Sequence, residues 1–302
     1  MKLASLYYRA LKLSGALALA RRLRSDGVIL CYHNVVADRA AEAPHALGLH
    51  MSRADFERQV RWLAGTYELV SLEELVVRRA RGAPLCGVAA LTFDDGYAGV
   101  FEYAWPVLQE LGVPATVFVV AGAPECDEPF WWDHPGVLPI LSDARRDEWL
   151  TVLRGDRAAI LRSAGVAHGS NHVPRACRPA GWDTIADAAR AGLGIGVHSA
   201  THRALPALDA SELHAEVVAS RETVTRHTGV TPQFFAYPYG LWNDRVRDAV
   251  RAAGYRAAFT LDHGAASGGA STWSLARLNV PAGIEDAAFQ AWTAGLEPRG
   301  GP

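Results

Sequence analysis

The chain alternates between short apolar runs and amphipathic segments from residue 27 onward. Ser52 with Asp55 and Ser71 with Glu74 mark two helix starts, because a serine followed by an acid three residues later forms a cap. The strand-like runs span 27–35, 87–93, 113–121, 193–199, 232–238 and 255–261, and the helical segments span 52–65, 71–80, 182–192, 209–229 and 241–254. Buried strands separated by helices predict an α/β fold with a largely parallel sheet or barrel, whose chemistry lies at the carboxyl ends of the strands.

One core domain accounts for this alternation. At 302 residues and 50% hydrophobic composition, the chain could form one large domain or two small ones. No repeat, low-complexity tract or proline-rich linker divides it. The stretch at about 122–180 gives mixed signals, and we interpret it as an insertion into a domain that spans 27–302.

Residues 1–26 form a predicted basic helix ahead of this domain. They carry six Lys and Arg residues and no acid before Asp26. The longest apolar stretch, 13–20, is too short to cross a bilayer. A signal peptide is an alternative, because 18–20 resembles a cleavage site, although two arginines follow it directly. Several apolar residues fall near one helical face, which suits either a membrane surface or packing on the main domain: Leu3, Leu6, Tyr7, Ala10 and Leu13.

Charge and cysteine content argue against two further classes of protein. A formal net charge of −2, with 21% charged residues, provides no bulk electrostatic case for nucleic-acid binding. The cysteines are scattered without a CxxC pair, which argues against a cysteine zinc site and a disulfide framework: Cys31, Cys86, Cys126 and Cys177. We expect small buried thiols in a reducing compartment, and hence a cytoplasmic protein, with peripheral membrane contact and export left open.

Polar residues that can carry chemistry follow three of the apolar runs. The pair Asp94-Asp95 ends one run, His198 and His202 end a second, and the segment AYPYG (236–240) ends a third. Because four residues make about one helical turn, the two imidazoles are expected to point at the same spot. Two histidines and one carboxylate make a three-ligand metal site with open positions, as catalysis requires.

Such a metal would explain why two aspartates stand side by side. One can bind the cation while its neighbour stays ionised in the cation's field and acts as a base. A cation held in this way lowers the pKa of its water from ~15.7 to about 7, and Gly96 lets both carboxylates face one cleft. Each motif alone has a simpler reading, since paired aspartates also cap helices and HxxxH is common on surfaces. Their occurrence after three apolar runs favours the metal site.

In this order, TFDDG (92–96), HSATH (198–202) and YPYG (237–240) resemble the polysaccharide deacetylase family of carbohydrate esterases, over roughly residues 28–280. That family includes deacetylases of chitin oligosaccharides, peptidoglycan and biofilm poly-N-acetylglucosamine. The resemblance implies an irregular (β/α) barrel, which agrees with the alternation of strands and helices.

The resemblance also implies a role for each matching position. Asp94 matches the catalytic base, while Asp95, His198 and His202 match the metal ligands. Tyr239 matches the residue whose backbone N–H faces the oxyanion, and losing one such donor typically costs ~3–4 kcal/mol. Zinc is the default ion, although this ligand set also suits cobalt, nickel or manganese.

The chain departs from the family pattern in two places. Many members have an arginine where this chain has Ala236, and many have a Leu-His-Asp motif, whose histidine protonates the leaving amine, where this chain reads LARLNVP (275–281). The biofilm deacetylase subgroup resembles the chain more closely here, with a Tyr-His after the first strand and no such arginine. His33 is therefore our candidate for the general acid, against the simpler reading of a hydrogen-bonded histidine in the barrel mouth. Arg277 is a candidate to orient Asp94.

Three tryptophans are candidates for sugar contact. Trp131 and Trp132 could form an aromatic floor with the carboxylate of Asp133 beside it, and Trp242 follows Gly240 by two residues. Adjacent aromatics are more often packed in a core or a lid. The histidines outside the motifs are expected to be structural or on the surface: His45, His50, His134, His168, His172, His214 and His227.

Together, the residues and the resemblance predict a metal-dependent hydrolase that removes acetyl groups from N-acetylated sugars. Asp94 would take a proton from the attacking water, and His33 would supply one to the departing amine. Two alternatives stay open. One is a hydrolase of O-acetyl esters or cyclic amides on the same scaffold, and the other is a carbohydrate-binding relative without turnover, suggested by the missing acid motif.

Overall fold

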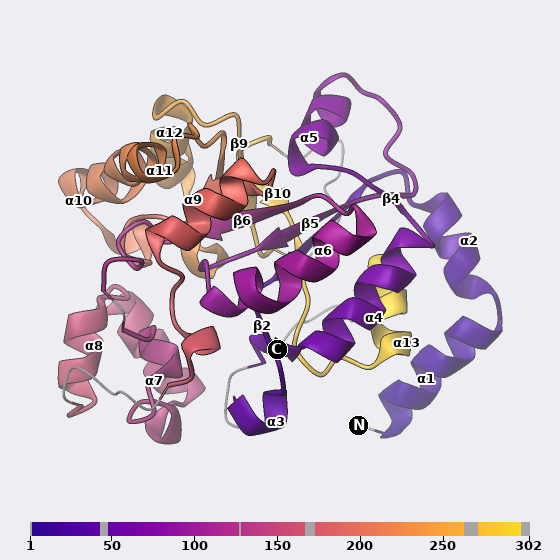
Figure 1. Ribbon diagram of the computed structural model, residues 1–302, viewed down its shortest axis with the longest axis horizontal. Coiled ribbons are helices and arrows are strands. Elements are labelled where there is room, and N and C mark those ends of the chain that lie inside the picture. The colour runs from indigo at the N-terminus through magenta and orange to yellow at the C-terminus, as the bar shows by residue number, and fades with distance from the viewer. Residues whose placement is uncertain (1, 43–47, 127, 167–172, 263–270, 297–302) are drawn as a thin grey trace.

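A nearly closed barrel of parallel strands surrounded by helices forms the centre of the molecule (Figure 1). The computed structural model describes residues 2–42, 48–126, 128–166, 173–262 and 271–296. The strands of the barrel are β1 (Val28–Tyr32), β5 (Val88–Phe93), β6 (Ala115–Val119), β7 (Gly194–Val197), β8 (Phe234–Ala236), β9 (Ala257–Thr260), β10 (Leu275–Ala276) and β11 (Leu278–Asn279), and β4 (Glu68–Leu69) pairs with β5. The predicted α/β barrel is confirmed.

One short segment closes the ring. The strands follow the order β10-β9-β8-β7-β6-β5-β1-β11, and only Arg277 separates the two end strands in sequence. β10 pairs with β9 and β11 pairs with β1, so residues 275–279 bridge the two sides of the barrel. Arg277 therefore lies at the junction where the barrel closes.

The central strands of the barrel are buried on both faces, which explains their continuous apolar sequences. Every residue of β5 (VAALTF) and β6 (ATVFV) is buried. The parallel register sets Phe93 beside Tyr32 of β1 and Val117 of β6. Residues that follow these strands therefore emerge at the same rim of the barrel.

The apolar run at 27–35 forms two short strands rather than the single strand expected. β1 ends at Tyr32, and the next residues form β2 (Asn34–Val36), which pairs with β3 (His50–Ser52) in a separate two-stranded sheet. The chain leaves the barrel at His33 because the backbone of β2 bonds to β3 instead of continuing beside β5. His33 is thereby placed at the rim.

Helices cover the outside of the barrel, and the two predicted caps are confirmed. The Ser52 hydroxyl accepts a hydrogen bond from the N–H of Asp55, and the Ser71 hydroxyl accepts one from Glu74, both at 3.1 Å. The helices are α1 (Lys2–Leu13), α2 (Ala16–Leu23), α3 (Arg39–Glu42), α4 (Arg53–Ala64), α5 (Leu72–Ala80), α6 (Trp105–Leu111), α7 (Asp143–Thr151), α8 (Arg157–Ser163), α9 (Trp182–Arg190), α10 (Ala210–His214), α11 (Ser220–Thr228), α12 (Asp244–Ala252) and α13 (Asp286–Thr293).

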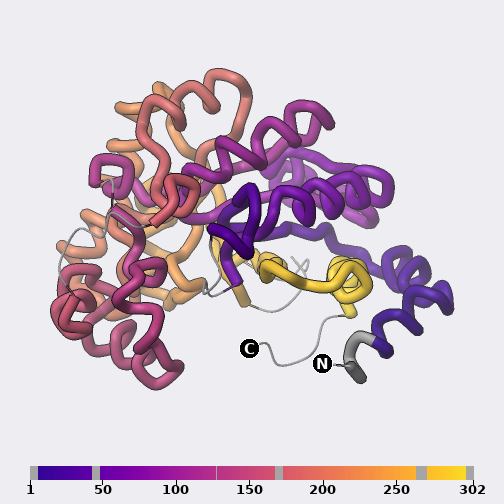
Figure 2. Tube along the Cα trace, turned by 60° about the horizontal axis from the view of Figure 1, so that its bottom comes forward, coloured from indigo at the N-terminus to yellow at the C-terminus, as the bar shows by residue number. Residues whose placement is uncertain are grey.

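Two segments stand outside the repeating pattern, at opposite ends of the molecule (Figures 1 and 2). Between β6 and α9, the described residues contain α7 and α8 but no barrel strand, which is compatible with an insertion at 122–180. The N-terminal segment forms two helices instead of the single helix predicted, because the chain turns at Gly15, whose φ is 74°. The division into N-terminal segment, domain and insertion stays a prediction.

Two sequence-wide expectations can be compared with the structure. All four cysteines are free, but only Cys31 and Cys177 are buried, so the expectation of buried thiols is wrong for Cys86 and Cys126. In the described ranges, none of the helices combines the length and apolar character needed to span a bilayer.

Candidate metal centre and active site

The pair Asp94-Asp95 lies at the carboxyl end of β5, on the rim of the barrel. Both residues are buried, and a tight left-handed turn follows, with φ 71° at Asp95 and 75° at Gly96. A left-handed conformation at a residue other than glycine costs roughly 1–2 kcal/mol, which the surrounding structure must offset. The turn brings Oδ2 of Asp94 to 3.9 Å and Oδ1 of Asp95 to 3.5 Å from Nε2 of His198. Both carboxylates therefore face the same histidine, as expected.

His198 and His202 come together through a loop, not through the helical turn that their spacing suggested. The residues between them are not helical, and both Ser199 (φ 64°) and His202 (φ 60°) are left-handed. The Ser199 hydroxyl accepts a hydrogen bond from the N–H of His202 at 3.0 Å, which closes the loop. The Nε2 atoms of the two rings lie 3.1 Å apart. The juxtaposition was predicted correctly, but from the wrong local geometry.

Three ligand-type atoms form a compact triangle at this rim. Oδ1 of Asp95 lies 3.5 Å from Nε2 of His198 and 3.3 Å from Nε2 of His202. The two imidazole nitrogens lie 3.1 Å apart. In a tetrahedral site with metal–ligand bonds of about 2.0–2.1 Å, neighbouring ligand atoms lie about 3.3 Å apart, so all three separations fit such a site. Oδ1 of Asp95 is buried and has no hydrogen-bond partner among the described residues. The donor set therefore fits a divalent cation.

The ring of His198 is oriented for metal binding by the backbone of β8. Its Nδ1–H donates to the carbonyl of Ala236 at 2.8 Å, which leaves a lone pair on Nε2 facing Asp95. Burial lowers the pKa of His198 to about 4, although the charge of Asp94 opposes this shift. The imidazole is therefore neutral at physiological pH, as a metal ligand must be.

Asp94 is clamped by Arg277, the residue at the barrel junction. Nη1 of Arg277 donates to Oδ1 of Asp94 at 2.7 Å and Nη2 donates to Oδ2 at 2.6 Å, and both side chains are buried. Burial is the largest influence and would raise the pKa of Asp94, but the charge and hydrogen bonds of Arg277, together with the nearby histidines, hold the pKa well below the ordinary 3.8. Arg277, from the segment that closes the barrel, thus contacts the carboxylate of Asp94 in a chain that has Ala236 where many relatives have an arginine.

His33 and Cys31 approach Asp94 from the end of β1. Ligand-type atoms of Cys31, His33 and Asp94 lie within 4.8 Å of one another. The Cys31 thiol donates to Oδ2 of Asp94 at 3.3 Å, and burial raises the pKa of that thiol well above its ordinary value. Because Cys31 stays protonated and Asp94 is bound by Arg277, this second cluster is poorly suited to a metal. His33 is only partly buried, so it can reach a substrate at the rim.

Tyr239 covers the other side of the histidine pair. Its φ is 58° in the short 3-10 segment Pro238–Gly240, and its ring lies edge-on to His202 with centroids 4.5 Å apart. Its hydroxyl accepts a hydrogen bond from Nε1 of Trp131 at 3.1 Å. The left-handed backbone of Tyr239 and its ring are thereby both fixed beside the candidate metal ligands.

Trp131 and Trp132 do not form the exposed aromatic floor for a sugar that the sequence suggested. Trp131 and Trp132 are only 3% and 5% exposed, and the indole of Trp132 lies 4.6 Å from the ring of His202 while stacking on Phe130 at 4.8 Å. They form a wall around His202 rather than an exposed floor. Trp242 is partly buried, and its Nε1 donates to Asp262 at 2.9 Å, so its ring remains a candidate for sugar contact.

The wall is supported by a buried polar network that sequence reasoning missed. Asp133 does not face solvent to bind hydroxyls. Its Oδ1 lies 2.8 Å from Nε2 of His50, and its Oδ2 accepts a hydrogen bond from the Tyr97 hydroxyl at 2.5 Å. Tyr97 in turn accepts a hydrogen bond from Nε1 of Trp132 at 2.8 Å. The network links β3 to the aromatic residues that hold His202 in place.

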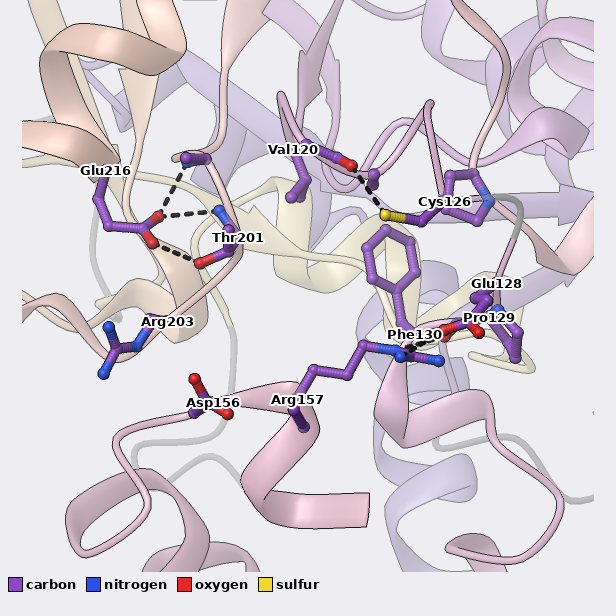
Figure 3. Close-up of a pocket in the computed structure, with 15 residues that line it drawn as sticks. Val120, Cys126, Glu128, Pro129, Phe130, Asp156, Arg157, Thr201, Arg203 and Glu216 are labelled. Atoms are coloured by element: carbon purple, nitrogen blue, oxygen red, sulfur yellow. Dashed lines mark hydrogen bonds and ion pairs between the residues drawn. The ribbon is translucent and has the colours of Figure 1, made fainter. Parts of the chain in front are cut away.

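Glu216 is a second residue that the sequence did not reveal, and it supports the loop that carries His202. One carboxylate oxygen accepts hydrogen bonds from the N–H groups of Ala200 and Thr201, both at 2.9 Å, and the other accepts one from the Thr201 hydroxyl (Figure 3). Glu216 is buried. Its negative charge is therefore used to fix the loop, because three donors satisfy it.

A cavity of about 410 Å³ opens beside this loop (Figure 3). Thr201 and Phe130, which line it, are the neighbours in sequence of His202 and Trp131. Arg157, at the start of α8, also lines the cavity and forms an ion pair with Glu128 at 2.5 Å. The segment 122–180 thus supplies one side of a hollow next to the candidate metal ligands.

The missed residues carried no signal that a single sequence could show. His50 lies 83 residues from Asp133 and Glu216 lies within a helical segment, so both read as ordinary polar residues, while Asp133 was considered only as a sugar ligand. Of the other histidines, His134 is buried, His227 is half-buried and stacked on Trp182, and His214 is exposed. His45, His168 and His172 lie outside the described residues.

Comparisons with known proteins identify a common family. The model of the family described as "Polysaccharide deacetylase" matches residues 81–258, more than half of the chain. A Bacillus subtilis (strain 168) protein named "Putative polysaccharide deacetylase YxkH" is 22% identical over 266 residues, which cover 87% of this chain and 75% of that protein. The poly-beta-1,6-N-acetyl-D-glucosamine N-deacetylase of Staphylococcus aureus (strain MSSA476) is 29% identical over 73 residues, which cover 24% of this chain and 25% of the relative.

Solved structures share the fold at low sequence identity. The Streptococcus pyogenes deacetylase PplD, in complex with acetate, is 19% identical with a TM-score of 0.64, and the match covers 90% of this chain and 99% of that one. IcaB from Ammonifex degensii is also 19% identical, with a TM-score of 0.61 over 90% of this chain and 98% of that one. These likenesses support the barrel architecture described above.

Proposed function

The chain belongs to the polysaccharide deacetylase family, and from that premise we propose that it is a divalent-metal-dependent hydrolase of N-acetylated amino-sugar polymers or oligomers. The observation that carries the proposal is the buried triangle formed by Asp95, His198 and His202 beside Asp94, a carboxylate held ionised by Arg277. A protein that only binds carbohydrate, without hydrolysing it, has no need for three ligand atoms at a tetrahedral spacing.

The proposed metal site and base occupy neighbouring positions on the rim. Asp95, His198 and His202 would hold the cation, with zinc the default and cobalt, nickel or manganese also suited to these donors. A cation held there supplies Lewis-acid chemistry, which polarises a carbonyl and lowers the pKa of water from ~15.7 to about 7. Asp94, fixed by Arg277, accepts the proton of the attacking water as the new C–O bond forms.

The departing nitrogen needs a proton as the C–N bond breaks, because an amine leaves poorly as an anion. We propose that His33 supplies it, since it is partly exposed at the rim and lies within 4.8 Å of an Asp94 oxygen. The backbone N–H of Tyr239 is proposed to donate to the developing oxyanion, a type of contact worth ~3–4 kcal/mol. The products are acetate and a free amino sugar.

The substrate class follows from family membership and one partial match. The matched Staphylococcus aureus relative is named for poly-β-1,6-N-acetylglucosamine, which supports an N-acetylglucosamine chain as the substrate here. The absence of arginine at position 236 and the Tyr32-His33 pair resemble the same subgroup.

Acetate release from N-acetylglucosamine oligomers, after chelation and readdition of zinc or cobalt, tests the proposal. We expect release to depend on the added metal and to fall by roughly 10²–10⁴-fold in Asp94→Asn, because that variant lacks the general base. Metal analysis should show retained metal in Asp94→Asn and lost metal in His198→Ala. An Asp94→Asn rate equal to the wild type would contradict the mechanism.

The same assay separates the rival functions. An O-acetylated sugar used as the substrate in parallel distinguishes an esterase from an amidase. Oligomer binding without acetate release at any added metal would identify a non-catalytic relative.

A further inference from the structure

The helices α1 and α2, residues 2–23, follow one another along one edge of the molecule with a bend at Gly15 (Figures 1 and 2), and this bent pair is called the hairpin below. Several inward side chains attach it to the body, including Leu11, which packs in the same cluster, and Arg21, which lies over the Trp62 ring. The Tyr8 hydroxyl accepts a hydrogen bond from Nε1 of Trp292 at 3.1 Å, and Leu17 packs with the small residues Ala287 and Ala291 of α13. The opposite sides of both helices therefore face outward.

The outward sides are apolar, which is the reverse of an ordinary surface helix. Leu6 and Leu13 are 69% and 88% exposed and share one helical face, being seven residues apart, and Leu19 and Leu23 are 59% and 75% exposed at a spacing of four. With Tyr7, they make up five of the eight large apolar side chains that are exposed among the described residues. An amphipathic helix normally turns its leucines to the core, so this arrangement needs a partner.

The charge of the hairpin indicates the partner. Neither α1 nor α2 contains an acidic residue, while Arg9, Lys12 and Arg22 are exposed on them. Glu285 and Asp286, at the start of α13, line a hollow beside Arg9 and Lys12, and Arg58 binds Asp286 at 3.0 Å. Among the described residues, Arg9, Lys12 and Arg22 form no ion pair, and exposed leucines flanked by such cations are the features of a helix that lies in the interface of an anionic bilayer.

We propose that the hairpin is a binding surface for membranes that contain anionic phospholipids. Its leucines enter the boundary between headgroups and acyl chains, and its cations contact the phosphates. Because this surface lies outside the metal centre, the inference goes beyond the proposed function and does not depend on it.

The fold orients the site relative to such a membrane. α2 lies at the amino ends of the strands, where the Cys86 thiol, just before β5, approaches the carbonyl of Arg22 at 3.6 Å. Asp94 follows the opposite, carboxyl end of the same strand. A bilayer in contact with α2 therefore leaves the metal centre open to a polymer that arrives from the aqueous side.

Vesicle co-sedimentation of the full chain tests the proposal. We expect strong binding to vesicles of phosphatidylcholine mixed with phosphatidylglycerol and weak binding to phosphatidylcholine alone. Leu6→Gln with Leu13→Gln should weaken binding at least about tenfold by removing apolar burial. Arg9→Gln with Lys12→Gln should weaken it by roughly fivefold per cation and reduce its sensitivity to salt. Glutamine keeps the helix propensity at all four positions.

Val152→Gln is the matched control, because Val152 is 68% exposed but lies at the end of α7, away from the hairpin. It should bind vesicles like the wild type, and circular dichroism should show the same fold in every variant. The proposal would be overturned if the double-leucine variant bound vesicles as strongly as the wild type. It would also be overturned if the wild type bound neither vesicle composition. If the wild type instead forms a dimer, does not bind vesicles, and becomes monomeric in the double-leucine variant, the partner of the hairpin is a second copy of the chain rather than a membrane.

Discussion

Asp94 is held as an anion in the protein interior by its two-point contact with Arg277. Desolvation opposes the charge, but the charge and hydrogen bonds of Arg277 and the nearby histidines together more than compensate, so the pKa of Asp94 falls below its ordinary 3.8. Removing one partner of a buried ion pair is costly because the other charge is left buried without compensation. At the residue scale, this pair should therefore contribute both to stability and to activity.

The stability contribution of Asp94 should depend on pH in a defined direction. Since its pKa is lower in the folded state, its stabilising effect is complete above the ordinary value of 3.8 and is lost as the pH falls toward the folded pKa. We expect Asp94→Asn to lower the free energy of unfolding by about 3–5 kcal/mol at neutral pH. Urea unfolding of both proteins across acidic and neutral pH should show this difference shrinking only below about pH 4. A difference that grows on acidification would contradict the assignment.

The role of His33 can be separated from metal binding. His33→Gln keeps a similar shape but cannot deliver the proton, so we expect acetate release to fall by roughly 10²-fold or more. The metal content should stay unchanged, because His33 is not one of the three atoms of the triangle. An unchanged rate would mean that another group protonates the amine.

At the scale of elements, the loop 198–202 depends on neighbours that are far away in sequence. Its two left-handed residues bring the imidazoles together, and Glu216 holds the loop through hydrogen bonds from two backbone N–H groups and from the Thr201 hydroxyl. The other face of His202 rests on Trp132, which the Tyr97, Asp133 and His50 network fixes. These contacts orient the ligands before a cation arrives.

Glu216→Gln should weaken metal binding without removing a ligand. The amide cannot accept from all three donors, so the loop loses its fixed conformation, and we expect affinity for zinc to fall by about 10-fold or more. Competition with a chromogenic chelator measures this change. Glu222→Gln serves as the control, because Glu222 is an exposed acid on α11. Equal affinities in the two variants would show that Glu216 does not position the loop.

At the scale of the whole molecule, the barrel, the insertion and the hairpin make distinct contributions. The barrel brings its strand ends to one rim, and the insertion provides Trp131, Trp132 and Asp133 to wall the site. The hairpin contacts the body through Tyr8, Leu11 and Leu17. It approaches β5 at Cys86, before the strand begins, whereas Asp94 follows the other end of that strand. The catalytic chemistry should therefore survive without the hairpin.

Removing residues 1–26 tests the proposed domain boundary. We expect a folded chain that releases acetate at the wild-type rate from soluble oligomers. The melting temperature should fall, by roughly 2–4 °C for each kcal/mol of packing lost on α13. A truncated chain without cooperative unfolding would place the hairpin inside the domain instead.

The local motifs and the barrel were predictable because they depend on short-range patterns. Apolar runs show which strands are buried, and serine–acid spacings mark helix starts such as those at Ser52 and Ser71. The positions of Asp94, Asp95, His198 and His202 at strand ends indicated one shared site. The break at His33 and the loop at 198–202 escaped prediction, since strand pairing and left-handed backbone arise from contacts with distant segments.

By itself, the sequence determined the strand and helix pattern, the family motifs and the type of each ligand, because these depend on residue identity and spacing. Only the tertiary structure decided that Arg277 clamps Asp94, that Glu216 and Asp133 support His202, and that the leucines of the hairpin face outward. The physical reason is that hydrogen bonds, desolvation and burial depend on distances between side chains. Such distances exist only once segments far apart in the chain have packed together.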